Sequence, residues 1–498
     1  MNPALLSLIT FSPLLGVLAL LFIDKENKKL ARQIGLGASL LTFVLSLIML
    51  VQFDPNGGLQ GVTNAVWIPV ADWNITYSMG MDGMSILLIL LTTFLTPITI
   101  FSTWTTVHDR VKEFMIFFLL LEVGMLGVFF ALDLFLFYVF WEFTLVPMYF
   151  LIGIWGGDNR RYAAVKFFLY TMAGSILMLL AILWLGIEGG TFYLPDLIAA
   201  GNIPADTQIW LFLAFAAAFA IKVPIWPLHS WLPDAHVQAP TAGSVILAGV
   251  LLKMGTYGFL RFNIPLFPEA SMELAPLMGV LGVIGILYGA AVSYSQQDVK
   301  KLVAYSSVSH LGFVILGLFA LNAQGIQGGI LQMINHGLST GALFLLVGMV
   351  YERRHTRDMD QYGGLWKVVP VYSVLMLIVT LSSMGLPGLN GFVGEFTILL
   401  GAFGSDYLSP WLAGFGALGV ILAAVYMLYM FQKMFLGPVT VEANNALKDL
   451  TWQEIATLAP LLLFIFWIGL YPKPFFNLMG PAVETLVANI DKVAMVVK

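Results

Sequence analysis

The chain has 498 residues, of which 59% are apolar and 10% are charged, and its formal net charge at pH 7 is −5. Soluble domains have about 25% charged residues, so this composition excludes a soluble globular protein. Apolar runs of about twenty residues recur along the whole length, whereas a membrane β-barrel would show alternating segments of about ten residues. The sequence therefore predicts an all-α polytopic membrane protein.

The chain contains no cysteine. This excludes disulfides, iron–sulfur ligation and thioether-linked haem within the chain. Motifs for a phosphate-binding loop, a dinucleotide-binding turn, a metal cluster and a nucleophile elbow are also absent from the sequence. We therefore expect no ATP hydrolysis, no nicotinamide binding and no metal site, and we expect any electron transfer to take place in other subunits.

Hydropathy predicts about fourteen membrane-spanning helices. In chain order they cover residues 3–23, 31–52, 82–106, 114–131, 134–156, 163–187, 208–230, 243–262, 273–293, 302–321, 327–350, 370–404, 411–436 and 453–472. The twelfth is too long for one straight span and contains GLPGLNG at 385–391, which predicts a discontinuous helix. The first lacks a preceding basic residue and a cleavage site, so we expect it to be retained. Between the second and third, residues 67–79 alternate enough to predict a hairpin.

Lysine and arginine gather in the loops that follow odd-numbered helices, whereas the loops at 53–81 and 188–207 contain neither. Basic loops face the cytoplasm, so both termini are expected on the outer side. Arg261 is one of the few basic residues that this topology assigns to an outer loop. The localisation that we expect is a bacterial inner membrane, with both termini in the periplasm.

The seventh and twelfth predicted helices share a proline near mid-span, Pro224 in one and Pro387 in the other. The two helices are five apart, and an odd number of helices inverts the second copy of a repeat. We therefore expect two inverted five-helix repeats with discontinuous helices 7 and 12. The expected organisation is helices 1–3 at 1–113, the first repeat at 114–262, the second at 273–436, and helix 14 with a tail at 437–498.

Lys222 and Lys253 lie inside predicted spans, where a lysine costs about 2.5–3.5 kcal/mol on insertion scales. Pro224 and Pro227 also remove hydrogen-bond donors next to Lys222. Burial destabilises the charged ammonium of Lys222, whereas a nearby carboxylate, such as that of Glu142, stabilises it. A pair of these residues that opens and closes would therefore change the proton affinity of the lysine. This arrangement indicates a pump element, although an ion pair that is purely structural is the alternative.

The other ionisable residues near the centres of predicted spans extend this set. The candidate proton-carrying residues are Glu142, Lys222, Lys253, His310, His336 and Glu395, with His229 and Glu122 as accessory candidates. At about 1.5 Å per residue, most lie within about 5 Å of the centre of their span, which favours lateral transfer in the plane of the membrane. A membrane histidine can also simply bond a neighbouring helix, and the pair His310 and His336 permits axial ligation of a haem.

Four segments of the sequence are similar to those of a known protein family. They are ALDLFLFYVFWEFTLVPMYFLIGIWGG, AFAIKVPIWPLHSWLPDAHVQAPTAGSVILAGVLLKMGTYGFLRF, SQQDVKKLVAYSSVSHLGF and MINHGLSTGALFLLVGMVYERRHTRD. They resemble the antiporter-like subunits of respiratory complex I, and the resemblance covers nearly the whole chain. With Glu395 in GLPGLNGFVGEF, the chain resembles the subunit M or chain 4 family. The sister subunits and the sodium/proton antiporters usually have lysine at this position.

The resemblance implies a proton-translocating subunit of NADH:quinone oxidoreductase that lies among other antiporter-like membrane-arm subunits. It implies that flavin, iron–sulfur clusters and quinone belong to partner subunits, that this chain holds no cofactor and that it binds no nucleic acid. The implied roles are a switching ion pair for Glu142 and Lys222, a central relay for Lys253, a terminal acid for Glu395, and polar links for His310 and His336. The alternatives are a subunit of a multisubunit cation/proton antiporter or membrane-bound hydrogenase complex, and a haem-carrying or purely structural membrane subunit.

Overall fold

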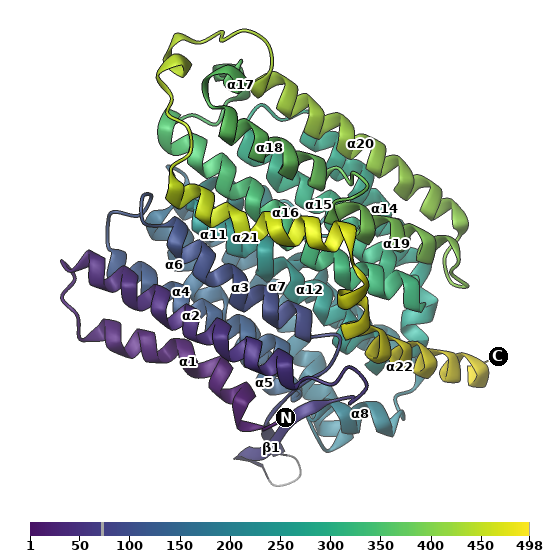
Figure 1. The fold of residues 1–498 in the computed structure, drawn as a ribbon. Helices are drawn as coiled ribbons and strands as arrows, with labels where there is room; N and C mark the ends of the chain where they lie inside the picture. The colour runs from purple at the N-terminus through teal and green to yellow at the C-terminus, as the bar shows by residue number, and fades with distance from the viewer. Residues whose placement is uncertain (71–73, 498) are drawn as a thin grey trace. The chain divides into compact units, whose positions relative to one another are not determined.

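The computed structural model describes residues 1–70 and 74–497, and these are helical apart from one β-hairpin and short connections (Figure 1). Twelve of the described helices are long and apolar enough to cross a membrane, judged by length and composition. The prediction of an all-α polytopic membrane protein is therefore confirmed. The count of about fourteen spans and the inverted repeats stay predictions.

The elements follow one another with short connections. The first part of the chain contains α1 (Ala4–Leu21), α2 (Lys28–Gln52), β1 (Gln60–Pro69), β2 (Asn74–Met81), α3 (Ile86–Ser102), α4 (Val111–Phe130), α5 (Leu134–Phe143), α6 (Leu145–Trp155), α7 (Arg160–Gly189), α8 (Leu194–Ala200), α9 (Ala205–Lys222), α10 (Trp231–Gln238), α11 (Thr241–Ile246), the π-helical turn η1 (Leu247–Leu251), α12 (Leu252–Gly258), the π-helical turn η2 (Phe259–Asn263) and α13 (Ile264–Leu266). The second part contains α14 (Pro268–Tyr294), α15 (Val299–Leu318), α16 (Ala323–Arg354), η3 (Met359–Gln361), α17 (Leu365–Val368), α18 (Pro370–Ser383), α19 (Asn390–Phe403), α20 (Pro410–Phe435), η4 (Glu442–Ala446), α21 (Trp452–Leu470) and α22 (Lys473–Val497).

Both predicted helix breaks are present. The seventh span ends as α9 at Lys222, and helix resumes only with α10 at Trp231. The twelfth is divided into α18 and α19, with Gly385 and Gly388 at positive φ angles of 77° and 93° between them. Prolines and glycines account for the breaks, because proline removes a backbone donor and glycine adopts left-handed conformations without strain.

The chain folds into two compact units. One consists of Met1–Val223, Val250–Ala275 and Phe476–Lys498, and the other of Pro224–Gly249 and Pro276–Phe475. The break after Lys222 is therefore the point at which the chain leaves the first unit. Compactness does not test internal symmetry, so the expected repeat boundaries at 114–262 and 273–436 stay predictions.

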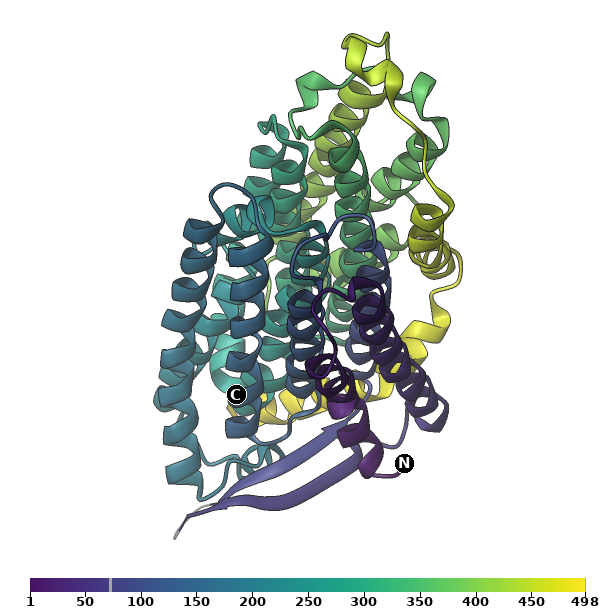
Figure 2. The same cartoon turned by 90° about the vertical axis from the view of Figure 1, so that its left-hand side faces the viewer.

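The hairpin of β1 and β2 belongs to the first unit and runs next to the N-terminus (Figure 2). Its strands are antiparallel, with Ala65 opposite Tyr77. The Tyr77 hydroxyl lies 2.7 Å from the Ser7 hydroxyl of α1, which ties the hairpin to the first helix. The predicted hairpin is confirmed, although it begins earlier than expected and residues 71–73 at its turn lie outside the described residues.

The C-terminal segment differs from the expected tail, because it forms the 25-residue helix α22. Phe475, Met479, Val483, Leu486 and Ile490 are buried and are spaced by three or four residues. This spacing places them on one face of the helix, which is the signature of an amphipathic helix that lies against protein. The helix was missed because its charged residues keep its hydropathy below that of a membrane span.

In the second unit, α16 packs most extensively against α19 and α15. Glycines permit this close approach: a Cβ atom on Gly401 of α19 would collide with the backbone of Gly325 in α16. Small residues commonly allow helix backbones to approach in membrane proteins. The two helices thereby bring the polar side chains of their facing surfaces within hydrogen-bonding range.

Candidate functional site

Lys222 ends α9 and is buried, with 1% of its surface exposed. Its Nζ lies 5.4 Å from the ring centre of Trp141 and 5.5 Å from that of Phe167. Nζ has no hydrogen-bond partner among the described residues. Since a cation within about 6 Å of an aromatic face is attracted to it, the two rings stabilise the buried ammonium.

The Trp141 ring is held in place from two sides. Its Nε1 donates a hydrogen bond of 3.0 Å to the Ser175 hydroxyl, which in turn donates to the carbonyl of Thr171 at 2.8 Å. The ring also packs edge-on against Phe219 at 5.5 Å between centres. Lys222 is therefore positioned against a rigid aromatic surface.

Glu142 follows Trp141 near the end of α5 and is partly buried. Its carboxylate interacts electrostatically with Lys222. Its Oε1 is buried and has no hydrogen-bond partner in the described parts of the chain. The two residues predicted to pair are thus close enough to attract each other, but no hydrogen-bonded ion pair joins them, and the pair is open.

Lys253 is fully buried in α12, between the π-helical turns η1 and η2. Such turns are rare, and they occur frequently at functional sites because they interrupt the regular hydrogen-bond ladder. Within α12, Lys253 and Tyr257 are four residues apart and share a face. Lys253 was predicted because a lysine inside an apolar span is costly, whereas the π-helical turns have no sign in the sequence.

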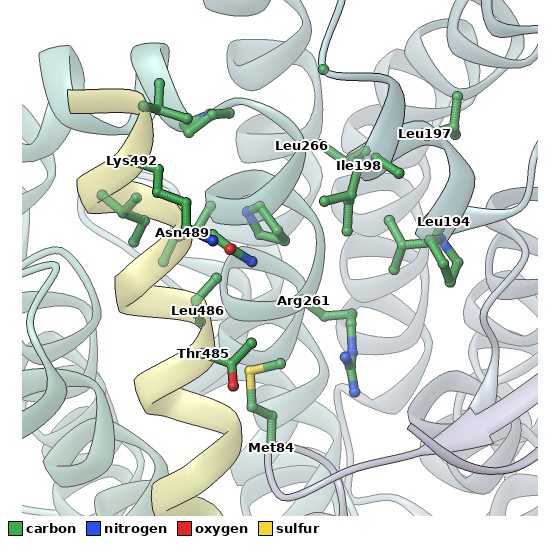
Figure 3. Close-up of a pocket in the computed structure, with 18 of the residues that line it drawn as sticks. Met84, Leu194, Leu197, Ile198, Arg261, Leu266, Thr485, Leu486, Asn489 and Lys492 are labelled. Atoms are coloured by element: carbon green, nitrogen blue, oxygen red, sulfur yellow. The ribbon is translucent and has the colours of Figure 1, made fainter. Parts of the chain in front are cut away.

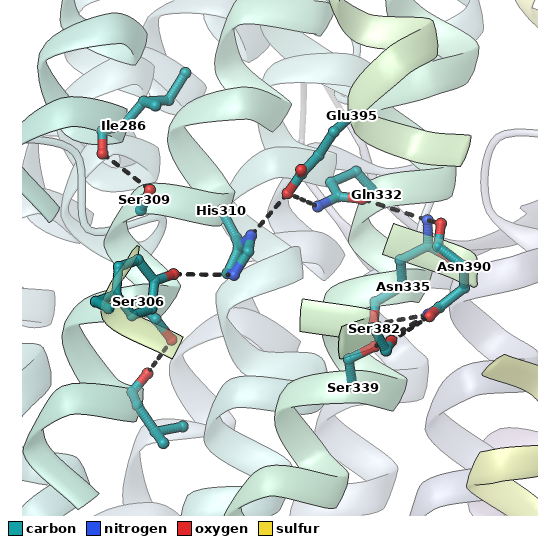
Figure 4. A network of polar contacts seen from close by, with 12 residues as sticks. Ile286, Ser306, Ser309, His310, Gln332, Asn335, Ser339, Ser382, Asn390 and Glu395 are labelled. Atoms are coloured by element: carbon teal, nitrogen blue, oxygen red, sulfur yellow. Dashed lines mark hydrogen bonds and ion pairs between the residues drawn. The ribbon is translucent and has the colours of Figure 1, made fainter. Parts of the chain in front are cut away.

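The second cluster of predicted residues lies in the second unit (Figure 4). His310 of α15 places Nδ1 2.9 Å from Oε1 of Glu395 in α19, and Nε2 3.5 Å from the hydroxyl of Tyr426. Gln332 of α16 donates to the same Glu395 oxygen at 3.1 Å. Glu395 is 2% exposed, so its carboxylate is held by protein groups rather than by solvent.

A network of amides and hydroxyls continues from this pair (Figure 4). Asn335 donates to the Gln332 side chain at 3.3 Å and to the carbonyl of Asn390 at 2.8 Å. The Asn390 side chain in turn bonds Ser339 at 3.1 Å and Ser382 at 2.5 Å. Sequence reasoning missed these residues, because single amides and hydroxyls in small-residue helices look like ordinary packing surface.

His336 lies beside this pair, with its ring centre 5.8 Å from that of His310. A polar cavity of about 10 Å³ is lined by both histidines, Glu395, Asn335 and Ser382, among others. This volume is close to the lower limit for one water molecule. A haem does not fit between the histidines, since the cavity is far smaller than a porphyrin and His310 already uses both ring nitrogens.

Gly385 provides space for Glu395. Its φ angle is +77°, and a Cβ atom there would lie 2.9 Å from Oε2 of Glu395. Oε2 is buried and has no hydrogen-bond partner among the described residues. The break between α18 and α19 therefore gives the carboxylate room on the side opposite His310.

The accessory candidates lie apart from these contacts. Glu122 of α4 is fully buried, and neither of its carboxylate oxygens has a hydrogen-bond partner within residues 1–70 and 74–497. His229 packs against Tyr288 at 5.0 Å between ring centres. His229 does not share a helix face with Lys222, because the helix ends at Lys222 and His229 lies in the connection to α10.

Arg261 lies inside the protein and not in an outer loop as predicted. It was assigned to an outer loop, but it is 5% exposed and forms a bidentate ion pair with Asp82, with distances of 2.7 and 2.8 Å. The helix was expected to end near residue 262, whereas it continues through η2 to Leu266. No group of three or more metal-binding side chains occurs among the described residues.

The chain matches the model of a protein family described as "NADH:quinone oxidoreductase/Mrp antiporter, TM" over residues 131–423. It is 47% identical to NADH-quinone oxidoreductase subunit M of Rhodobacter capsulatus, over 97% of this chain and 96% of that protein. It is 46% identical to NADH-ubiquinone oxidoreductase chain 4 of Arabidopsis thaliana, over 97% of each.

Two solved structures are also similar to this chain. A chain of respiratory complex I from Thermus thermophilus with bound NADH matches with a TM-score of 0.88 and 34% identity, over 97% of this chain and 99% of that one. A chain of the membrane-bound sulfane sulfur reductase, an archaeal respiratory membrane complex, matches with a TM-score of 0.83 at 24% identity, over 93% and 75%, and shares the fold.

Proposed function

The chain belongs to the NADH:quinone oxidoreductase/Mrp antiporter membrane family, and from this membership we propose that it is a proton-translocating membrane-arm subunit of NADH:quinone oxidoreductase, of the subunit M or chain 4 type. The resemblance seen in the four sequence segments is thereby confirmed. Relatives at 47% and 46% identity carry those names over nearly their whole length. The similar Thermus thermophilus chain belongs to a complex with bound NADH.

We propose that protons pass along the buried ionisable groups of both units. The proposed carriers are Glu142, Lys222, Lys253, His336, His310 and Glu395, with Glu122 and His229 as accessory groups. The inverted repeats at 114–262 and 273–436 would supply matching sets of these groups. Quinone reduction in partner subunits drives the transfer, and this chain itself performs no redox chemistry.

The single observation that carries the proposal is the open pair of Glu142 and Lys222. The ammonium of Lys222 is buried against aromatic rings and has no hydrogen-bond acceptor among the described residues. Closing the pair would raise the affinity of Lys222 for a proton and opening it would release the proton. Moving one charge against about 150 mV requires about 3.5 kcal/mol, and breaking a buried ion pair costs about 3–5 kcal/mol, so one such pair is sufficient.

The proposed function implies which molecules surround the chain. The neighbours are other membrane-arm subunits of the complex, including antiporter-like subunits on either side, and the lipid bilayer. Flavin, iron–sulfur clusters and quinone are bound by other subunits, and this chain binds no cofactor. We propose a bacterial inner membrane as the location, and the basic residues of the odd-numbered loops support the placement of both termini in the periplasm.

A second candidate is a subunit of a multisubunit cation/proton antiporter or of a membrane-bound hydrogenase complex. The matched family includes the Mrp antiporters, which favours keeping this candidate. Glu395 argues against it, because the resemblance places lysine at that position in those antiporters.

Isolation of the intact complex through an affinity tag on this chain distinguishes the two candidates. We expect flavin- and iron–sulfur-containing NADH-oxidising subunits to co-purify, and NADH to drive proton uptake into vesicles that hold the complex. Lys222→Ala should abolish the uptake while the complex stays assembled, and Lys448→Ala, on an exposed connection, serves as the matched control. Co-purification of antiporter subunits alone, or normal uptake with Lys222→Ala, would overturn the proposal.

A further inference from the structure

Arg261 and Asp82 form a buried, bidentate ion pair in the first unit. The two terminal guanidinium nitrogens each donate to a different carboxylate oxygen, at 2.8 and 2.7 Å, and Arg261 and Asp82 are 5% and 6% exposed. Removing two such charges from water costs several kcal/mol per ion, and a bidentate geometry offsets this cost. The pair therefore joins the connection before α3 to η2.

Tyr257 lies between Arg261 and Lys253 along the helix. Arg261 Nε donates to the Tyr257 hydroxyl at 3.0 Å, and this hydroxyl donates to the carbonyl of Phe129 at 3.1 Å. Tyr257 is 1% exposed and also interacts electrostatically with Asp82. Since Lys253 and Tyr257 are four residues apart in α12, the side chains of 253, 257 and 261 follow one another along one side of the helix.

A cavity of about 780 Å³ begins where this line ends (Figure 3). Asp82 and Arg261 form part of its wall, together with Thr485 and Asn489 of α22 and Ile198 of α8. Figure 3 shows the labelled side chains of α22 on one side and Arg261 on the other, with Ile198 and Leu266 above Arg261. All lining residues belong to the first unit, and they come from the connections and helix ends that the basic-loop distribution assigns to the outer side.

We propose that Lys253, Tyr257 and Asp82 form a proton-release branch from the central lysine to this outer cavity, and that Arg261 gates it. The inference rests on the proposed function of the chain. While the ion pair is closed, Arg261 neutralises Asp82 and occupies both of its oxygens, so the carboxylate accepts no proton. The branch is then sealed.

When the ion pair of Arg261 and Asp82 opens, a proton can be transferred in two steps. The Lys253 ammonium gives a proton to the Tyr257 oxygen, and the hydroxyl proton of Tyr257 passes to the freed carboxylate of Asp82. Asp82 then releases its proton to water in the cavity, and Arg261 returns to the carboxylate. Lys253 ends neutral, Tyr257 and Asp82 are unchanged, and one proton has moved outward.

Two substitutions test the proposed proton-release branch. Tyr257→Phe removes only the hydroxyl, and Asp82→Asn keeps the size of the side chain and its ability to accept from Arg261 but removes the carboxylate. We expect each to lower the number of protons pumped per NADH in the assembled complex at least twofold, with NADH oxidation by the isolated complex in detergent less affected. A purely structural role would lower assembly or both activities together, which overturns the proposal.

The cavity is tested separately by thiol modification, which is practicable because the chain has no cysteine. Thr485→Cys places a thiol in the cavity wall, and Glu484→Cys places one on the exposed neighbouring position of the same helix, outside the cavity. A cationic methanethiosulfonate is added to the intact complex in detergent, where both faces of the chain are accessible, and the complex is then reconstituted into vesicles. Proton pumping is then compared with that of the same variant before modification.

We expect modification of Thr485→Cys to reduce proton pumping at least twofold, and modification of Glu484→Cys to leave it unchanged. Failure of Thr485→Cys to react would show that the cavity is filled by lipid or by a neighbouring subunit, and this would overturn the proposal. Full modification with unchanged pumping would also overturn it. In both cases, pumping by the unmodified complex shows that the proposed function of the chain still holds.

Discussion

His310 Nδ1 lies 2.9 Å from Glu395 Oε1, and both residues are almost completely buried in the second unit. The distance is that of a hydrogen bond, so one proton lies between the imidazole and the carboxyl group. The terminal acid and the histidine of the proposed route are therefore one proton-binding element.

The first prediction concerns this element. Glu395→Gln keeps the shape of the side chain and its bond to His310 but removes its capacity to take up and release a proton. We expect NADH-driven proton uptake to fall by about tenfold or more, as is usual when a proton-transfer group is removed. Glu442→Gln, at an exposed position, is the control. Wild-type uptake by an assembled Glu395→Gln complex would exclude Glu395 from the route.

A second prediction tests the space that Gly385 leaves for Glu395. Gly385→Ala places a methyl group 2.9 Å from Oε2 of the carboxylate. Gly388→Ala imposes a similar backbone strain at a φ of +93° but meets nothing within 4 Å, so it is the matched control. We expect Gly385→Ala to lower proton uptake by several-fold more than Gly388→Ala at equal assembly. Equal effects would mean that only the backbone of the break matters.

The third prediction concerns the aromatic support of Lys222. Trp141→Leu removes the ring that lies 5.4 Å from Nζ. A desolvated cation–π contact contributes about 1–2 kcal/mol, so we expect coupled turnover to fall about 5- to 30-fold. Trp141→Phe should retain most activity because it keeps an aromatic face. Trp210→Leu, at a position that is 74% exposed, controls for the loss of a tryptophan.

The fourth prediction is a stability effect at Asp133, which begins α5. Its carboxylate accepts hydrogen bonds from the backbone nitrogens of Phe135 and Leu136 and from both donors of Thr76. Asp133→Ala removes this cap and the link to β2. We expect a loss of about 0.5–2 kcal/mol, seen as a lower Tm of the isolated complex than for Asp24→Ala, whose side chain is exposed. Equal Tm values would show that the cap contributes nothing.

The sequence was informative where one residue type has a strong local effect. Pro224 next to Lys222 and the glycines around Pro387 predicted both helix breaks, because proline and glycine act on their own backbone. Glu142, Lys222 and Glu395 were found because a charge in an apolar span is costly wherever its partner lies.

The remaining features depend on contacts that have no local sign. Asp82 and Arg261 are 179 residues apart in the chain, so their pairing could not be anticipated, and Arg261 was taken for a loop residue. Asn335 and Asn390 acquire their importance only because α16 and α19 approach so closely. In contrast, the apolar spacing of α22 was present in the sequence, and a helical-periodicity test of the last 26 residues could have found it.

The central claim is that opening and closing of the Glu142 and Lys222 pair moves protons. The most direct test is the number of protons pumped per NADH by proteoliposomes that contain the intact complex with Glu142→Gln, compared with Glu142→Asp. We predict that Glu142→Gln abolishes coupled pumping, because the amide cannot attract the Lys222 ammonium, and that Glu142→Asp retains part of it. An assembled Glu142→Gln complex that pumps the wild-type number of protons per NADH would contradict this account.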